Sequence, residues 1–163
     1  DAIRQEAARN AEYQHMGTTL VCAVARSDMA IIGNIGDSRA YHITPEGIFQ
    51  ISRDHSVVEN MVAKGDLTPL EARTHPNRNL ITRALGPDIH AKADTFELPW
   101  HKDEFLLLCS DGLVNTVSDQ EMLFEVLHDG DVNECLDHLL QISLQRGAPD
   151  NITAVLLLNE EGR

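Results

Sequence analysis

Three aspartates lie at the ends of apolar segments, where a carboxylate is either a turn former or a ligand. Asp37 lies in "IGDSR", Asp111 in "CSDGL" and Asp150 in "APDNIT". Each stands beside a glycine or an asparagine, residues that let the backbone turn sharply. None of the three segments contains a lysine, and Arg39, which alternates to the same strand face as Asp37, is a candidate partner for that carboxylate.

A single Asp-Gly or Asp-Asn pair is most often an ordinary turn. Three such acids at the ends of separate strands favour a site for a hard cation. The set consists of carboxylates, and no His or Cys stands at ligand spacing, so Mg²⁺ or Mn²⁺ fits this pattern better than Zn²⁺.

Other catalytic chemistries find little support. The sequence has 8 histidines but no H-x-x-x-H or H-E-x-x-H spacing, and it has no G-x-S-x-G, Walker A or G-x-G-x-x-G motif. Five histidines are predicted to lie on exposed or half-buried faces: His42, His90, His101, His128 and His138. Nucleophilic-serine, P-loop and dinucleotide chemistry are therefore disfavoured.

The composition indicates one globular domain. The chain has 163 residues, 42% of them hydrophobic, and a formal net charge of −13, which would repel the phosphate backbone of nucleic acid. Its three cysteines are far apart and odd in number, which is typical of free thiols in a reducing cytoplasm. No apolar run reaches the length of a membrane span, so no membrane partner is predicted.

Hydrophobic periodicity predicts an α+β domain. Strands are expected over 18–25, 29–36, 39–43, 48–51, 105–109 and within 150–160, and the short connectors among the first four favour antiparallel pairing. A helix opens the chain and is expected to end at Gly17. Four further helices begin at capping residues: Ser56, Thr68, Ser118 and Asp131.

Six segments together resemble the ordered motif set of bacterial metal-dependent Ser/Thr protein phosphatases, the PPM or type 2C family. They are "MGTTL" (16–20), "GNIGDSRAYHI" (33–43), "ISRDHS" (51–56), "HPNRNLITRALG" (75–86), "LLLCSDGL" (106–113) and "GAPDNITAVLL" (147–157). The resemblance covers residues 13–158. It implies part of an α-β-β-α sandwich of two antiparallel sheets flanked by helices, with the N-terminal strands and the first helix missing.

The resemblance also implies a site for two Mn²⁺ or Mg²⁺ ions. Asp111 and Asp150 would ligate the two core ions, and Asp37 with Asp111 would contribute to a possible third, weaker site. The substrates implied are proteins phosphorylated on Ser or Thr, including a cognate Ser/Thr kinase. An insertion at about 54–85 matches the family's flap beside the site, and His75 and Arg78 are expected to serve its structure rather than catalysis.

One part of the family pattern does not occur in the sequence. The phosphate-gripping Arg, the Glu-Asp pair and the "DGMGGH"-like turn have no counterpart among these residues. We therefore expect residues 1–163 to form a single C-terminal fragment of a phosphatase domain. Such a fragment is expected to be inactive or impaired alone and to self-associate through exposed strand edges. The alternative is a non-catalytic, phosphatase-like binding or regulatory module.

Overall fold

A three-stranded antiparallel sheet forms one layer of the protein. The computed structural model describes residues 1–128 and 131–161. In the first sheet, β2 (Met29–Ile35) lies between β1 (Leu20–Ala25) and β5 (Asp94–Pro99). The inner face of this sheet buries Ala30 and Ile32 completely, because alternate side chains of β2 point to that face.

The second antiparallel sheet has four strands. Its order is β4 (Gly47–Gln50), β3 (Arg39–Thr44), β6 (Phe105–Cys109) and β7 (Ala154–Leu158). Its two faces serve two cores: Ala40 and Leu106 pack toward the first sheet, whereas Tyr41 and Leu107 pack toward the helices. The sheet is buried on both sides, and β6 is therefore an unbroken apolar run.

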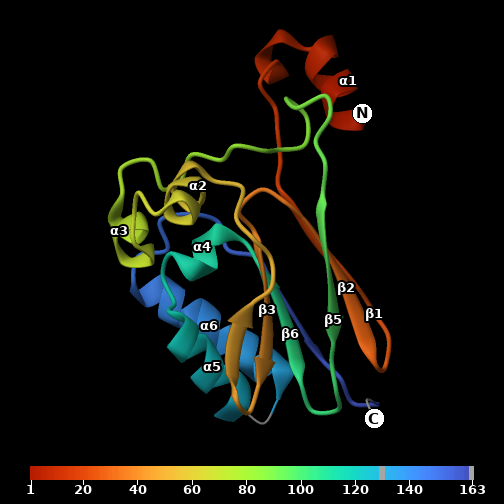
Figure 1. The fold of residues 1–163 in the computed structure, drawn as a ribbon, viewed down its shortest axis with the longest axis vertical. Coiled ribbons are helices and arrows are strands. Elements are labelled where there is room, and N and C mark those ends of the chain that lie inside the picture. The colour runs from red at the N-terminus through yellow and green to blue at the C-terminus, as the bar shows by residue number, and fades with distance from the viewer. Residues whose placement is uncertain (129–130, 162–163) are drawn as a thin grey trace.

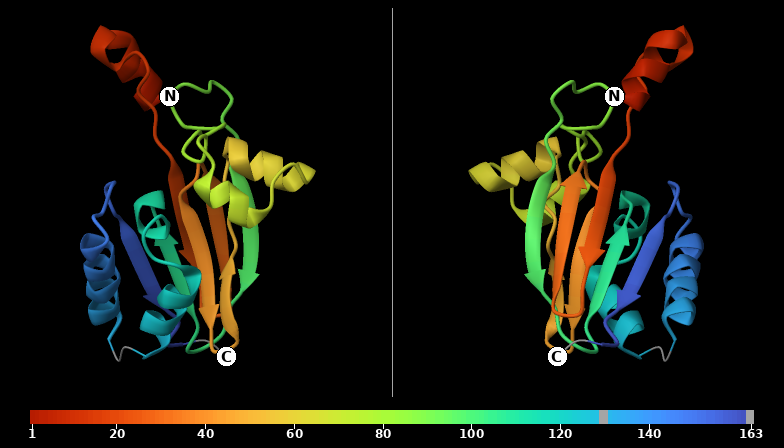
Figure 2. Two further views of the ribbon diagram at one scale, coloured as in Figure 1. Left: turned by 90° about the vertical axis from the view of Figure 1, so that its left-hand side faces the viewer. Right: turned by 90° about the vertical axis from the view of Figure 1, so that its right-hand side faces the viewer.

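Helices cover the outer face of the four-stranded sheet. The helices α4 (Asp111–Val114), α5 (Asp119–His128) and α6 (Val132–Gln145) follow β6 in the chain. Met122 of α5 and Leu139 of α6 are buried against the sheet. Figure 2 shows the resulting order of layers, from the β1-β2-β5 sheet through the second sheet to α5 and α6.

Between β4 and β5 the chain makes a helical excursion at one end of the sandwich. It contains α2 (Val57–Lys64) and α3 (Pro69–Thr74), and Figure 1 places both beside the end of the second sheet from which β3 starts. Ser56 caps α2 and a complete capping box at Thr68 opens α3, as the sequence predicts.

The outer face of the β1-β2-β5 sheet is apolar and open to solvent. Leu20, Val24, Met29 and Ile31 are between 41% and 67% exposed. Helix α1 (Ala2–Arg9) and the short 3-10 helix η1 (Ala11–Tyr13) precede this sheet and project beyond it (Figure 1). No helix in residues 1–128 and 131–161 has the length and apolar character that crossing a bilayer requires.

The observed architecture confirms the predicted fold class and corrects three elements. Helix α4 was not predicted, because its four residues are too few to show a helical period. The opening helix stops at Asn10 instead of Gly17, because α1 buries none of its residues and no packing favours its continuation. Strand β5 was not predicted. It is an edge strand whose exposed face carries Thr95 and Glu97, so its short sequence has only a weak apolar signal.

Candidate metal centre

Strand pairing brings the three predicted aspartates to one end of the second sheet. Arg39 pairs with Cys109 between β3 and β6, and Cys109 pairs with Ala154 between β6 and β7. Asp37 lies two residues before β3, Asp111 lies two residues after β6, and Asp150 lies four residues before β7. Because neighbouring strands run antiparallel, three segments far apart in the sequence meet at the same edge.

Close backbone contact joins the segments that carry Asp111 and Asp150. Ser110 N–H donates to Thr153 O at 3.0 Å, and Thr153 N–H donates to the Ser110 hydroxyl at 3.0 Å. A Cβ at Gly112 would collide with the carbonyl oxygen of Asn151. The sequence predicts a sharp turn at Gly112, whereas the structure shows that this glycine permits close approach of two backbones at the start of α4.

Asp37 lies in a turn that does need a glycine. Gly36 has φ = 106°, and a Cβ there would collide with the side chain of Thr19. On the other side of Asp37, the hydroxyls of Ser38 and Thr19 are 2.8 Å apart and share a hydrogen bond. The predicted sharp turn is therefore confirmed at this position.

The three carboxylates influence one another electrostatically. Burial, and next the negative charge of Asp111, raise the pKa of Asp37 to about 6. Burial and then the charge of Asp150 likewise raise the pKa of Asp111. A divalent cation would relieve this repulsion, so the donors fit Mg²⁺ or Mn²⁺ in kind. Within the described part of the chain, however, no three His, Cys, Asp or Glu side chains form a ready-made metal cluster.

Arg39 does not pair with Asp37. Its guanidinium binds Asp54, with Nη2 2.7 Å from Oδ2 and Nε 3.0 Å from each carboxylate oxygen, and Nη1 donates to the Tyr41 hydroxyl at 3.0 Å. Asp54 comes from the segment after β4, which packs beside β3 and presents both oxygens to the guanidinium fork. Arg39 therefore acts on Asp37 only through its charge, which lowers the pKa of that carboxyl against the larger effect of burial.

His75 and Arg78 belong to the loop that follows α3. His75 accepts a hydrogen bond from the Asn77 amide at Nδ1, 3.1 Å away, and its carbonyl oxygen accepts one from the Arg78 amide. The Arg78 side chain is exposed. Only the Asn77 bond involves a side chain, that of His75, because Arg78 donates through its backbone amide. The five histidines predicted at surfaces are all exposed or half-buried.

Two polar residues beside the site were not predicted from the sequence. Asp54 and His55 follow β4, and His55 is only 6% exposed, with its ring against the Gly36 turn. The signal that could have found them is "SRDHS", a run of polar residues at 52–56 whose first and last two members are buried.

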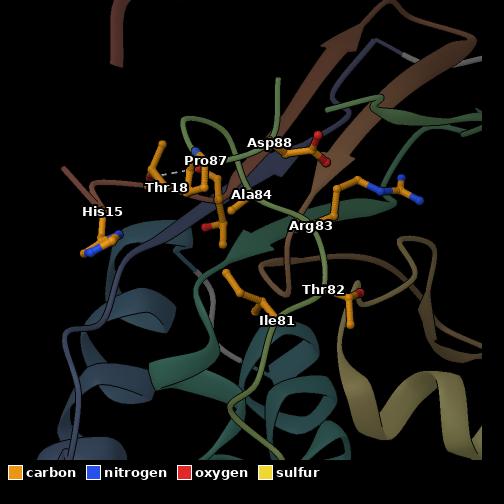
Figure 3. Close-up of a pocket in the computed structure, with 10 residues that line it drawn as sticks. His15, Thr18, Ile81, Thr82, Arg83, Ala84, Pro87 and Asp88 are labelled. Carbon is orange, nitrogen blue, oxygen red and sulfur yellow. Dashed lines mark hydrogen bonds between the residues drawn. The ribbon is translucent and has the colours of Figure 1, made fainter. Parts of the chain in front are cut away.

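A pocket of about 540 Å³ lies between residues of 15–19 and of 81–88. Thr18 and Leu85 exchange both backbone hydrogen bonds there, each 2.9 Å long. Figure 3 shows that the side chain of Arg83 points away from Thr18 and Ala84. Its guanidinium therefore forms hydrogen bonds with other residues.

The sandwich architecture is that of a class of phosphatases. Residues 1–156 match the family model described as Protein phosphatase 2C, and the chain therefore belongs to the protein phosphatase 2C family.

Several known proteins are similar to this chain. A serine/threonine phosphatase, stp, of Listeria monocytogenes is 36% identical over 151 residues, which are 91% of this chain and 60% of that protein. The crystal structure of Stp1 from Staphylococcus aureus is 41% identical, with a TM-score of 0.92 over 96% of this chain and 62% of the other. A PstP catalytic domain solved with two manganese ions is 32% identical, with a TM-score of 0.85 over 95% of this chain and 64% of the other. The chain thus spans about three fifths of the curated relative.

Proposed function

We propose that this chain forms part of a Mn²⁺- or Mg²⁺-dependent protein serine/threonine phosphatase, which hydrolyses phosphomonoesters on proteins. The observation that carries the proposal is the convergence of Asp37, Asp111 and Asp150 at one sheet edge through the β3-β6-β7 pairing. The family membership and the manganese-bound PstP relative support it.

In this proposal Asp111 and Asp150 hold the two core ions, and Asp37 shares a possible third ion with Asp111. When bound, divalent cations supply activation of water and neutralise the charge on the phosphoryl group. The contribution of the chain would be to hold oxygen ligands near each other. The Ser110–Thr153 hydrogen bonds and the contact at Gly112 support this, because they join the segments that carry the two proposed core ligands.

The chain supplies the type of ligand that these cations prefer, carboxylate oxygens, but too few of them for the proposed ions. Because the chain spans about three fifths of its curated relative, we propose that the remaining ligands lie in the part of the domain that these residues do not match. Residues 1–163 alone are then inactive or impaired. The excursion at about 54–85 would be the flap beside the site, with His75 and Arg78 maintaining its structure.

The substrates in this proposal are proteins phosphorylated on Ser or Thr, among them a cognate Ser/Thr kinase. A cytoplasmic location belongs to the same proposal. The open apolar face of the β1-β2-β5 sheet supports self-association of the isolated chain.

A second candidate is a phosphatase-like binding module without catalysis. It is favoured by one observation, the lack of a three-ligand cluster within the described residues. The two candidates differ in whether the complete domain hydrolyses phosphate esters.

Hydrolysis of p-nitrophenyl phosphate with and without Mn²⁺ tests the proposal. It should be measured for this chain and for a longer version that carries the segment present in the relatives. We expect Mn²⁺-dependent activity in the longer version and its loss in Asp111→Asn. The matched control is Asp137→Asn, which removes an exposed acid from α6. A longer version that is inactive with every divalent cation tried would favour the binding module.

A further inference from the structure

His55 binds both backbone groups of Gly36, the residue before Asp37. The His55 amide donates to Gly36 O at 2.9 Å, and the Gly36 amide donates to Nδ1 of the His55 ring at 3.0 Å. The imidazole is only 6% exposed, so water has little access to compete for these hydrogen bonds. One residue, through its backbone amide and its imidazole, therefore holds the entry to the turn that carries Asp37.

Few other interactions can hold this turn. Gly36 has no side chain to pack, and its φ of 106° is open mainly to glycine. On the far side of Asp37, Ser38 is tied to Thr19 by their shared hydrogen bond. Asn34 Nδ2 also donates to Gly36 O, at a longer 3.4 Å, so within the described residues the Gly36 amide has His55 Nδ1 as its side-chain acceptor while the Gly36 carbonyl is shared between His55 and Asn34.

The hydrogen bonds also define where the imidazole proton lies. Because the Gly36 amide donates to Nδ1, that nitrogen is unprotonated and the ring proton is on Nε2. Nε2–H then donates to Asp94 Oδ2 at 3.1 Å. Arg83 Nη1 is 3.0 Å from the same nitrogen, but both groups are donors, so this is a contact and not a hydrogen bond.

Asp94 and Arg83 hold the outer edge of the ring. Arg83 Nη1 donates to Asp94 Oδ1 at 2.7 Å and to Lys92 O at 2.8 Å. The hydrogen bonds from His55 and then Arg83 lower the pKa of Asp94, which keeps its carboxylate available as an acceptor. Strand β5, which begins at Asp94, thereby orients the His55 ring toward Gly36.

The two ends of the helical excursion are hydrogen-bonded to each other at His55 and beside it. His55 O accepts from the Thr82 amide at 2.7 Å, and the Val57 amide donates to Leu80 O at 2.9 Å. Figure 3 shows Thr82 and Arg83 as neighbours on the wall of the pocket, with the Arg83 side chain directed away from the Thr18 side. The base of the excursion and the Asp37 turn are therefore linked through His55.

We propose that His55 is a positioning residue for the metal centre: through its Nδ1 bond to Gly36 it fixes the Asp37 turn from the base of the 54–85 excursion. His55 touches neither substrate nor reacting atoms in this arrangement. The inference rests on the proposed role of Asp37 as a metal ligand, and it adds a residue that the three-aspartate pattern does not contain.

A matched pair of substitutions at His55 distinguishes the contribution of the Nδ1 hydrogen bond from that of the Nε2 hydrogen bond. In His55→Asn, the side-chain oxygen can take the place of Nδ1 and keep the bond from Gly36 while the bond to Asp94 is lost. In His55→Gln, the longer amide can reach Asp94 while the acceptor for Gly36 is lost. Both variants remove the imidazole, so a role in filling space alone predicts similar behaviour in the two.

The first measurement is the rate of hydrogen exchange at the Gly36 amide, which nitrogen-15 NMR detects on this chain without metal. Loss of one hydrogen bond should speed exchange about tenfold in His55→Gln, with little change in His55→Asn. The second is the Mn²⁺ concentration that gives half-maximal p-nitrophenyl phosphate hydrolysis in the longer version. It should rise about tenfold or more in His55→Gln and much less in His55→Asn.

The two measurements distinguish failure of this inference from failure of the proposed function. Wild-type exchange at Gly36 in His55→Gln, or equal effects of the two substitutions, would overturn the positioning role whatever the metal result. A different result is that exchange follows the expected pattern but Asp37→Asn leaves the Mn²⁺ dependence unchanged. The hydrogen bond from Gly36 to His55 would then be confirmed, but neither Asp37 nor His55 would have a role in the metal centre.

Discussion

Arg39 and Asp54 form a forked ion pair beside the three aspartates, with Nη2 2.7 Å from Oδ2 and Nε within 3.0 Å of both carboxylate oxygens. The two side chains are 27% and 11% exposed, so the pair is largely removed from water. Gln50 donates a further hydrogen bond to Oδ1 of Asp54 at 3.0 Å. Although burial opposes the charged form, the bond to Asp54 raises the pKa of Arg39 above its ordinary value.

Breaking this ion pair from one side should be more harmful than removing it altogether. Arg39→Met leaves the Asp54 carboxylate buried without its cation, and we expect a loss of about 2 kcal/mol in the free energy of unfolding, reduced from the fully buried case by the partial exposure of Arg39. Arg39→Met with Asp54→Leu should cost less than the sum of the two single changes. Urea denaturation of the four proteins gives the coupling energy, and strictly additive losses would contradict a coupled pair.

Asp37 should destabilise the metal-free protein at neutral pH. Its folded-state pKa of about 6 lies above the ordinary value of 3.8, so ionisation disfavours the folded form above pH 6. As the pH falls from 6 to 3.8, this penalty disappears. Asp37→Asn should therefore raise the free energy of unfolding by about 1 to 2 kcal/mol at pH 7, after allowance for screening by water, and the gain should vanish near pH 4.

Urea denaturation of wild type and Asp37→Asn at several pH values without divalent cations measures this gain. Comparison with the wild type at each pH removes the contribution of other carboxylates, such as Glu104, whose pKa is lowered in the folded state. Asp137→Asn, on the exposed face of α6, should leave stability unchanged at every pH. A loss of stability in Asp37→Asn at pH 7 would mean that Asp37 is a structural acid.

The apolar face of the three-stranded sheet should cause the isolated chain to associate. Val24 is 67% exposed and Ile31 is 45% exposed, and they lie opposite each other in the β1-β2 register. Val24→Lys with Ile31→Lys should shift the protein toward monomer, because lysine on this face opposes close contact between copies. Leu70→Lys is the control, since Leu70 is 76% exposed but lies on α3.

Sedimentation velocity across a range of concentrations measures the association. Cys22 provides a second observable, because it is exposed and pairs with Gly33 on the same two strands. If the face is covered by another copy, the Cys22 thiol should react more slowly with a thiol reagent at high protein concentration. A wild-type chain that stays monomeric at all concentrations would contradict the expectation.

The aspartates could be found from sequence because each ends a strongly apolar strand. The five-residue apolar run from Phe105 to Cys109 is shorter than a typical helix and favours a buried strand, so the residues that follow it are expected at the end of a sheet. Strand β5 escaped detection because only Phe96 and Leu98 among its six residues are large and apolar. Its pairing with β2 is decided by tertiary contact and not by local pattern.

The partners of the charged residues could not be predicted in the same way. Arg39 has the correct strand phase to reach Asp37, and the sequence alone offers no reason to prefer Asp54, which is 15 residues away. The choice depends on how the segment after β4 packs, as does the contact of His55 with Gly36. Local periodicity therefore locates the ends of strands, but not which loops meet there.

Gly112 should be the most sensitive position near the proposed core ligands. A Cβ at this position would collide with the carbonyl oxygen of Asn151, and Ile152 lies 3.3 Å away. Gly112→Ala must therefore move the segment carrying Asp150 away from Asp111. We expect a loss of about 2 kcal/mol in the free energy of unfolding, as is typical of overpacking in a tight interior, and a strong loss of Mn²⁺-dependent hydrolysis in the longer version.

Gly65→Ala is a suitable comparison for this glycine. Gly65 ends α2 with φ = 80° and has open space around its Cα, so its substitution should cost about 1 kcal/mol through backbone strain alone. Because Gly65 lies at the C-terminus of α2, outside the segments that carry the three aspartates, its substitution should leave the Mn²⁺ requirement unchanged. If Gly112→Ala lowered stability only as much as Gly65→Ala and kept full Mn²⁺-dependent activity, close contact between the two segments would not be what brings Asp111 and Asp150 together.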